Sequence, residues 1–398
     1  MSLKNDRVQK IAEWLFLLGI TLYTGYYYIY ICHFWKLEKN PIDMMNLKRY
    51  LYIALICMAL KIILTIWQYT HYEILFVIIG NALLFLCWRY SGSIDFIINF
   101  LLLVGVKNMD SKRVIKSMLL AGIIGVVYGL TIAFITNPES ISVTRNFGRG
   151  VVETRYRFST WHANTCHLVF TTLITFFLYA YYRSCNVFAY GVMLFINQEL
   201  FQLTRSRTGL ISGIISILMF CILKYGRILF KFKVIPVLFE LLNIGVILGS
   251  LYFGFVANTN SKWYQFIDGM ITGRLSVVKR CIQESGYHLF GSPMGGKVCG
   301  YGVFTQQVSG YVTELGFPRM LLEYGPIILI CVCVILFVAT WKLYYINNYE
   351  GMIFLAVCLL SFSVEAYYPA AYNPIPLIMG VGLFNNIKVR KKKDEKTK

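Results

Sequence analysis

The stretch VIKSMLLAGIIGVVYGLTIAFI, residues 114–135, decides the fold class of this chain. Its only charged residue is Lys116, near its start. A helix of this length extends about 33 Å, which matches a hydrocarbon core of roughly 30 Å. Backbone polar groups in lipid must be satisfied internally, and a continuously apolar segment of this length does so as a helix rather than as a barrel strand. The stretch therefore predicts a transmembrane helix.

Similar apolar runs recur along the whole chain. The 398 residues are 57% hydrophobic and only 14% charged, whereas a soluble domain carries roughly 25% charged residues. The mean hydropathy is +0.60. We therefore expect an all-α polytopic membrane protein with about twelve membrane-spanning helices. Their expected limits are residues 11–33, 49–68, 71–89, 91–106, 114–135, 162–182, 186–203, 208–223, 234–256, 319–341, 350–368 and 372–388.

Two connections between the expected spans are long. Residues 136–161 form an arginine-rich loop, and residues 257–318 form a large loop between the ninth and tenth expected spans. The other connections are tight. The whole chain, residues 1–398, is therefore predicted to form a single integral membrane domain.

The positions of lysine and arginine predict the orientation, because cytoplasmic loops carry an excess of positive charge. Arg7 and Lys10 precede the first expected span, and residues 389–398 form a basic tail. An even number of spans places both termini on one side. We therefore expect a multi-pass protein of the cytoplasmic (inner or plasma) membrane, with both termini cytoplasmic and residues 136–161 and 257–318 outside. Much of the net charge of +19 is then a topology signal, and no soluble basic domain indicates nucleic-acid binding.

Several arginines lie in the expected outer connections, where the rule of positive cytoplasmic loops predicts few positive charges. They are Arg145, Arg149, Arg155 and Arg157 in one loop, and Arg205 and Arg207 in a short turn. Arginine grips phosphate with a planar fork of donors, so an anionic ligand explains such a group. Lipid headgroup contact or snorkelling is the alternative for any single arginine. Arg205 and Arg207 also lie near a helix start, where free N–H groups attract anions.

Three stretches on the expected outer side form a recognisable pattern. They are Arg155-Tyr-Arg-Phe-Ser-Thr-Trp-His162-Ala-Asn164-Thr-Cys-His167; Thr204-Arg-Ser-Arg207-Thr-Gly209; and a dispersed set of Thr272-Gly-Arg274-Leu, Leu289-Phe-Gly291-Ser, Glu314-Leu-Gly-Phe317 and Leu321-Leu-Glu323-Tyr-Gly325. Their order and sidedness resemble the O-antigen polymerase and ligase superfamily (Wzy-like), and most closely the capsular and exopolysaccharide repeat-unit polymerases.

The resemblance implies a membrane glycosyltransferase of the GT-C type. Such an enzyme would transfer a growing glycan, with inversion, from a polyprenyl diphosphate to a hydroxyl of an incoming lipid-linked repeat unit. The implied partners are undecaprenyl-diphosphate-linked oligosaccharides, membrane lipid, and a flippase and chain-length regulator of the same pathway. The products would be capsule, exopolysaccharide or O-antigen. The family is thought to need no metal or other cofactor, and the outer loops carry no Asp-x-Asp or His/carboxylate ligand set.

The resemblance and the chemistry together suggest roles for particular residues. The leaving diphosphate needs fixed cations, and the acceptor hydroxyl needs a base. Glu314 is the favoured base, since related proteins have Asp or His there, although Leu315 and Phe317 replace the Asn and Tyr that follow in the family pattern. His162 is the second candidate for the base. The expected diphosphate-binding residues are Arg155, Arg157, Arg205, Arg207 and Arg274.

Further residues are expected to contact the glycan or to support the site. Asn164 is expected to bind sugar or phosphate, and Trp161 and Tyr311 to stack on sugar rings. Glu365 is expected to pair with an arginine or to line the glycan groove, and His167 to pack. The alternatives are a solvated carboxylate for Glu314, a surface salt bridge for Arg274, an interface anchor for Arg205 and Arg207, and a structural histidine for His162.

Three alternatives remain open from the sequence: a glycan ligase, a flippase and a non-enzymatic membrane scaffold. A ligase would use the same donor chemistry with a different acceptor. A flippase for lipid-linked oligosaccharides would also have about twelve spans, but it would be expected to show two similar halves. The chain shows no internal repeat, and the large loop at 257–318 is asymmetric.

Overall fold

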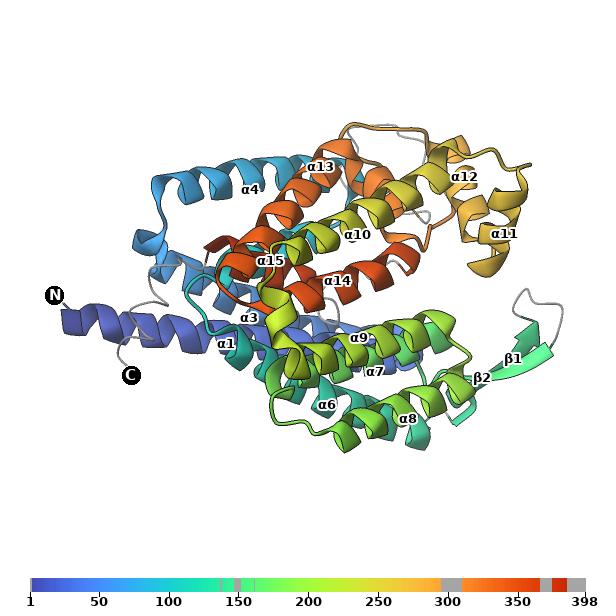
Figure 1. Cartoon of the computed structure of the whole chain (residues 1–398), viewed down its shortest axis with the longest axis horizontal. Coiled ribbons are helices and arrows are strands. Elements are labelled where there is room, and N and C mark those ends of the chain that lie inside the picture. Colours follow the sequence, from blue (N-terminus) through green and yellow to red (C-terminus); the bar gives the residue numbers. More distant parts are fainter. Residues whose placement is uncertain are drawn as a thin grey trace.

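The computed structural model describes residues 2–136, 138–146, 152–160, 162–294, 310–365 and 374–384. The described part is predominantly helical and includes one two-stranded sheet (Figure 1). The basic tail at 389–398 lies outside the described residues. The elements are α1 (Ser2–Cys32), α2 (Phe34–Lys39), α3 (Pro41–Leu64), α4 (His71–Ser91), α5 (Asp95–Gly105), α6 (Ser111–Thr136), β1 (Ser142–Asn146), β2 (Val152–Tyr156), α7 (Ala163–Tyr181), α8 (Val187–Thr204), α9 (Arg207–Tyr225), α10 (Val234–Leu251), α11 (Lys262–Met270), α12 (Arg274–Ser285), α13 (Gly316–Tyr345), α14 (Tyr349–Val364) and α15 (Ile375–Phe384).

A helix occupies each of the twelve segments that the sequence predicts as spans. Among the described residues, seven helices are long and apolar enough to cross a membrane: Asp6–Cys32, His71–Ser91, Ser111–Thr136, Ala163–Tyr181, Arg207–Tyr225, Val234–Val256 and Gly316–Tyr345. α5, α14 and α15 are apolar but shorter. α3 contains Lys48, Arg49 and Lys61, and α8 contains Asn197 and Glu199. The chain is thus a helical membrane protein, and the number of helices that cross stays a prediction.

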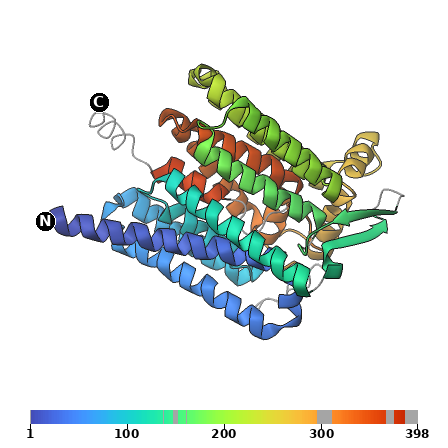
Figure 2. The same ribbon diagram turned by 90° about the horizontal axis from the view of Figure 1, so that it is seen from below.

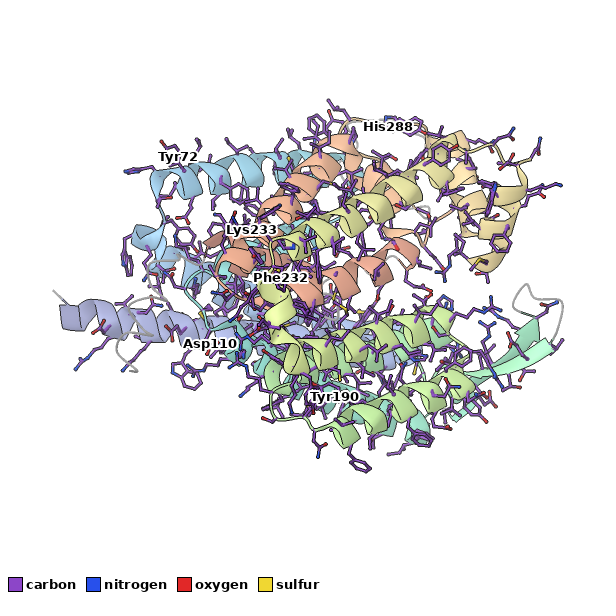
Figure 3. All side chains as sticks on the ribbon, viewed as in Figure 1. Tyr72, Asp110, Tyr190, Phe232, Lys233 and His288 are labelled. Atoms are coloured by element: carbon purple, nitrogen blue, oxygen red, sulfur yellow. The ribbon has the colours of Figure 1, made fainter. Side chains whose placement is uncertain are left out.

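The molecule has two opposite ends that are formed by different elements. The N-terminus of α1 lies at one end, and the β1–β2 hairpin with α11 and α12 lies at the other, in both views (Figures 1 and 2). We call the second end the hairpin end. Figure 3 places Asp110 and Lys233, from two connections predicted to be cytoplasmic, in the half that holds the N-terminus. The large connections predicted to lie outside therefore gather opposite those predicted to lie inside.

Glycines let α6 approach α1 closely. A Cβ atom added at Gly125 would lie 2.7 Å from Tyr28 Cβ, and one added at Gly129 would lie 2.4 Å from Cys32 Cβ. Tyr28 is fully buried at this contact. Helices in lipid associate through close van der Waals packing, because lipid tails are as apolar as the side chains. The glycines therefore determine how near these two helices lie.

A kink in α13 anchors the segment that follows α12. Gly325 has a φ angle of 84°, and Pro326 has no N–H to bond the carbonyl of Leu322. That carbonyl instead accepts a hydrogen bond from the Ser292 N–H at 3.0 Å. A Cβ at Gly291 would lie 2.1 Å from a backbone oxygen of α13, so only glycine fits this approach. Two of the stretches that resemble the family pattern therefore meet here through backbone packing.

The close approach of α6 to α1 can be tested with a pair of glycine variants. Gly129→Val should lower the free energy of unfolding by about 1–3 kcal/mol, because the new side chain overlaps Cys32. Gly191→Val on α8 is the matched control, because a Cβ at Gly191 meets nothing within 4 Å. The melting temperatures of the detergent-solubilised variants report the effect. Equal melting temperatures for the two variants would contradict the packing described.

Candidate functional site

A cavity of about 820 Å³ opens at the hairpin end, and we call it the arginine cavity. Its wall comes from the hairpin, the N-terminal ends of α7, α9 and α12, the residues before α13, and the C-terminal end of α14. Five arginines and two glutamates line it, so three formal positive charges are in excess. These residues are Arg145, Arg155, Arg157, Arg207 and Arg274, with Glu314 and Glu365.

The hairpin presents its arginines on one face. β1 pairs antiparallel with β2, so that Val143 lies opposite Arg155 and Arg145 lies opposite Glu153. Side chains alternate between the two faces of a strand, and these four therefore share one face. Arg155 Nε donates to Glu153 Oε1 at 2.9 Å. The hairpin lies within residues 136–161, which the sequence predicts as an arginine-rich connection between two spans, and its strands were not expected.

Arg274 reaches the cavity from a strained turn. Thr272 has a φ angle of 60° and Gly273 one of 79°, and a β-branched residue rarely adopts such a value. Asp268 stabilises the turn, because its Oδ1 accepts a hydrogen bond from the Leu275 N–H at 2.8 Å. Strain of this kind costs about 1–3 kcal/mol and collects at functional sites. The turn places Arg274 at the first position of α12.

Arg274 bridges two carboxylates. Its Nη2 lies 2.9 Å from Glu314 Oε2 and 2.6 Å from Glu365 Oε1, and its Nη1 donates to the Val364 carbonyl. Asn164 Nδ2 donates to Glu365 Oε1 at 2.9 Å. The Glu365 side chain is 12% exposed, whereas that of Glu314 is 49% exposed. Arg274 and Glu365 therefore form a buried pair, and Glu314 faces the cavity.

The environment of Glu365 favours its neutral form. This residue follows the last residue of α14, at the cavity wall. Burial raises the pKa of the Glu365 carboxyl to about 7, although the Arg274 guanidinium acts in the opposite direction. The negative charge of Glu314 raises it further. The ionised form of Glu365 therefore depends on Arg274.

His162 faces the same cavity from the position before α7. Burial at the cavity wall lowers the pKa of His162. The nearby Glu314 raises this pKa, whereas Arg145, Arg157 and Arg274 lower it. A neutral imidazole can accept a proton or a hydrogen bond, so His162 has the protonation state that a base requires.

Arg205 and Arg207 were both expected to bind the diphosphate, but the turn before α9 places only one of them at the cavity. Arg205 has a φ angle of 55°, and its Nη1 donates to Gln202 Oε1 at 2.8 Å, outside the cavity lining. Ser206 caps α9 by accepting a hydrogen bond from the Gly209 N–H at 3.3 Å. Arg207, at the first position of the helix, lines the cavity.

Seven of the ten site residues expected from the sequence line the arginine cavity. Among the others, Arg205 lies outside the lining, and the ring of Tyr311 lies 5.7 Å from the guanidinium of Arg280 and also outside it. Trp161 lies outside the described residues. The seven are Arg155, Arg157, Arg207, Arg274, Glu314, His162 and Asn164.

Arg145 and Thr272 also line the cavity, although neither had an assigned role from the sequence. Arg145 belongs to the group of arginines in the expected outer connections, and that grouping was its signal. Thr272 opens the stretch Thr272-Gly-Arg274-Leu, in which only Arg274 was given a role.

The structure gives His167 a packing role. Its Nδ1 lies 2.9 Å from Thr204 Oγ1, and its Nε2 lies 3.0 Å from Asn197 Oδ1. Both partners belong to α8, and a Cβ at Gly209 would lie 2.4 Å from the ring. His167 therefore joins α7, α8 and α9 below the cavity.

Removal of Arg274 tests the buried pair. Arg274→Gln should lower the free energy of unfolding, because Glu365 is left buried without its cation. Arg274 lowers the pKa of Glu365, which is about 7 in the parental protein, so its removal should raise that pKa further. The loss of stability should therefore be small at pH 6, where Glu365 is protonated in both proteins, and should grow above pH 7 toward about 3–5 kcal/mol. Arg274→Gln combined with Glu365→Gln should remove this growth. Thermal unfolding between pH 6 and 9 measures this, and a loss independent of pH would contradict it.

Comparison with known proteins supplies no relative for this site. The chain matches no family model, no curated protein and no solved structure. Within the described residues, no three His, Cys, Asp or Glu side chains form a group that could hold a metal ion.

Proposed function

We propose that this protein joins lipid-diphosphate-linked oligosaccharide repeat units into a polysaccharide at the outer face of the cytoplasmic membrane. The observation that carries the proposal is the arginine cavity, where cations from β1, β2, α9 and α12 meet two carboxylates at one end of a helical membrane protein. A transfer from a diphosphate to a hydroxyl needs both kinds of group. The resemblance to O-antigen polymerases points to the same chemistry and to a reaction without a metal.

The charge of the cavity suits a diphosphate. Its lining has three more positive than negative formal charges, and arginine forms paired hydrogen bonds with phosphate oxygens. Arg207 and Thr208 also place the N-terminus of α9 at the cavity, where helix N–H groups favour an anion. The donor diphosphate therefore binds on the side of Arg145, Arg157 and Arg207.

The carboxylate side of the cavity suits the acceptor. The acceptor hydroxyl oxygen attacks the anomeric carbon, the bond from that carbon to the diphosphate oxygen breaks, and the electron pair leaves with the diphosphate. Glu314 takes the hydroxyl proton, because it faces the cavity and Arg274 holds it at 2.9 Å. Asn164 and Glu365 position Arg274 from behind. His162 is the second candidate for the base.

The arrangement of the ends supports the proposed orientation. Asp110 and Lys233, from two of the connections that the sequence predicts as cytoplasmic, lie in the half that holds the N-terminus (Figure 3), away from the hairpin that lines the arginine cavity. With twelve spans and both termini in the cytoplasm, the cavity opens on the outer face. The substrates are then undecaprenyl-diphosphate-linked oligosaccharides, with a flippase and a chain-length regulator as partners in the pathway.

A glycan ligase is the second candidate function. It would use the same donor cavity and differ only in its acceptor, and His162 supplies a histidine base within that cavity. A flippase is the third alternative from the sequence.

The structure separates Arg207 from Arg205, and their variants test the diphosphate site. Arg207→Ala should reduce the rate of polymerisation at limiting substrate about 10- to 100-fold, since a charge-assisted hydrogen bond is lost. Arg205→Ala should leave it near the parental rate, because Arg205 donates to Gln202 instead. The assay resolves lipid-linked glycans by length in a deletion strain of the source, at matched membrane levels of each variant.

Three results of that assay would redirect the proposal. Repeat units that accumulate inside the cell without the protein indicate a flippase. Full-length polymer that stays on its lipid carrier indicates a ligase. Equal losses for Arg205→Ala and Arg207→Ala show that the cavity does not define the diphosphate site.

Glutamine variants of the two candidate bases distinguish their roles. Glu314→Gln should lower kcat by about 10²- to 10⁴-fold, the usual contribution of a general base. His162→Gln should raise KM with a smaller effect on kcat. Burial lowers the pKa of His162 below its usual value near 6.5, so protonation of His162 should weaken the activity only below pH 6.5. The opposite pattern, with kcat lost in His162→Gln alone, identifies His162 as the base.

A further inference from the structure

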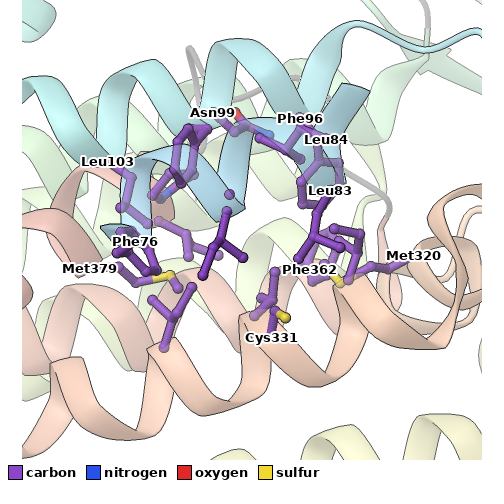
Figure 4. A pocket seen from close by; sticks show the side chains of 18 of the residues that line it. Phe76, Leu83, Leu84, Phe96, Asn99, Leu103, Met320, Cys331, Phe362 and Met379 are labelled. Carbon is purple, nitrogen blue, oxygen red and sulfur yellow. The ribbon is translucent and has the colours of Figure 1, made fainter. Parts of the chain in front are cut away.

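A second cavity lies among the helices of the membrane domain, and we call it the apolar cavity. It has a volume of about 250 Å³ and is lined by α4, α5, α13, α14 and α15. Figure 4 shows its side chains pointing toward a common space, including Phe76, Leu83, Cys331 and Met379. Asn99 is the only polar side chain among the described residues that line it. The cavity therefore suits a hydrocarbon ligand.

The apolar cavity adjoins the arginine cavity at the contact between α13 and α14. Phe317 and Phe362 line the apolar cavity and pack edge to face with ring centroids 5.0 Å apart. Glu314 lies three residues before Phe317, and Glu365 three residues after Phe362, and both line the arginine cavity. A Cβ at Gly316 would lie 2.1 Å from the Phe362 carbonyl oxygen, so the two segments touch at backbone distance. One pair of segments thus forms a wall of both cavities.

We infer that the apolar cavity holds the first isoprene units of the lipid whose diphosphate occupies the arginine cavity. This inference rests on the proposed function and adds the place of the lipid tail. A polyprenyl diphosphate has a strongly anionic head joined directly to a branched hydrocarbon, and the two cavities offer these two environments across the Phe317–Phe362 contact. Burial of hydrocarbon against aromatic and aliphatic side chains supplies affinity that the head alone lacks.

Asn99 distinguishes an isoprenoid from other lipids. Its Oδ1 is buried and has no hydrogen-bond partner among the described residues. An isoprenoid chain carries no donor for this oxygen, so Asn99→Leu should leave the affinity for the tail unchanged or raise it. A lipid with a hydroxyl group near this depth would instead lose affinity in Asn99→Leu.

The test compares a tailed and a tailless probe on the full-length protein in nanodiscs. The tailed probe is a polyprenyl diphosphate with a photoactivatable diazirine in its first isoprene units, and the tailless probe is methylenediphosphonate. Val332→Trp fills the apolar cavity, and Val334→Trp is the control, because Val334 lies on the same helix with 57% of its surface exposed and outside the lining. Val332→Trp should weaken binding of the tailed probe about tenfold or more and leave binding of the tailless probe unaffected. Val334→Trp should leave binding of both probes unchanged.

Cross-linking on the parental protein gives a second readout that needs no variant. The label should map to residues of α4, α5, α13, α14 or α15 that line the apolar cavity. The inference falls if the label maps elsewhere, if phosphatidylglycerol displaces it, if Val332→Trp binds the tailed probe normally, or if Asn99→Leu abolishes binding. In those cases the diphosphate site can still stand, since the tailless probe binds. If neither probe binds the parental protein, the proposed function fails together with the inference.

Discussion

The ion pairs of Arg274 connect the three segments from which the arginine cavity is built. Arg274 is only 8% exposed, and a buried guanidinium is costly in free energy unless carboxylates and carbonyls surround it. Glu314 lies two residues before α13, the Val364 carbonyl belongs to the last residue of α14, and Glu365 follows it. The need to satisfy one buried cation therefore holds the start of α12 beside the residues before α13 and the end of α14, and it leaves Glu314 partly exposed inside the cavity.

A second constraint comes from buried backbone carbonyl and N–H groups, which must find hydrogen-bond partners within the protein. The kink at Gly325 and Pro326 frees the carbonyl of Leu322, and Ser292 satisfies it. α12 and the residues that follow it are consequently attached at two points, by Arg274 at the start of the helix and by Ser292 beyond its end. A wall attached in this way can hold charged groups in fixed positions, which electrostatic stabilisation of a leaving group requires.

The chemical character of the interior changes sharply across one aromatic contact. On one side of Phe317 and Phe362 the lining is rich in arginine, and on the other side it is almost entirely hydrocarbon. The proposed substrates have the same division, because a charged diphosphate joins a polar glycan to an apolar tail. A protein that acts on such a molecule at a membrane boundary must offer a charged and an apolar environment side by side, because the diphosphate is bonded directly to the hydrocarbon tail. The adjacency of the two cavities is thus consistent with the proposed reaction.

Much of this protein could be predicted from the sequence. Apolar runs such as residues 114–135 placed helices correctly, and clusters of charge separated the two ends, because hydropathy and charge act locally along the chain. The hairpin was missed because the arginines were interpreted as loop residues, although their alternation with Val152, Thr154 and Tyr156 was visible.

Other features were decided only by the tertiary structure. Local pattern treats Arg205 and Arg207 alike, yet the left-handed turn at Arg205 directs only Arg207 to the cavity. Glu365 meets Arg274 only because α14 ends beside the start of α12. The apolar cavity likewise exists only where five helices fail to fill the space between them. Such contacts join residues far apart in sequence, and they depend on helix packing and on the pairing of buried charges, which no local pattern of residues specifies.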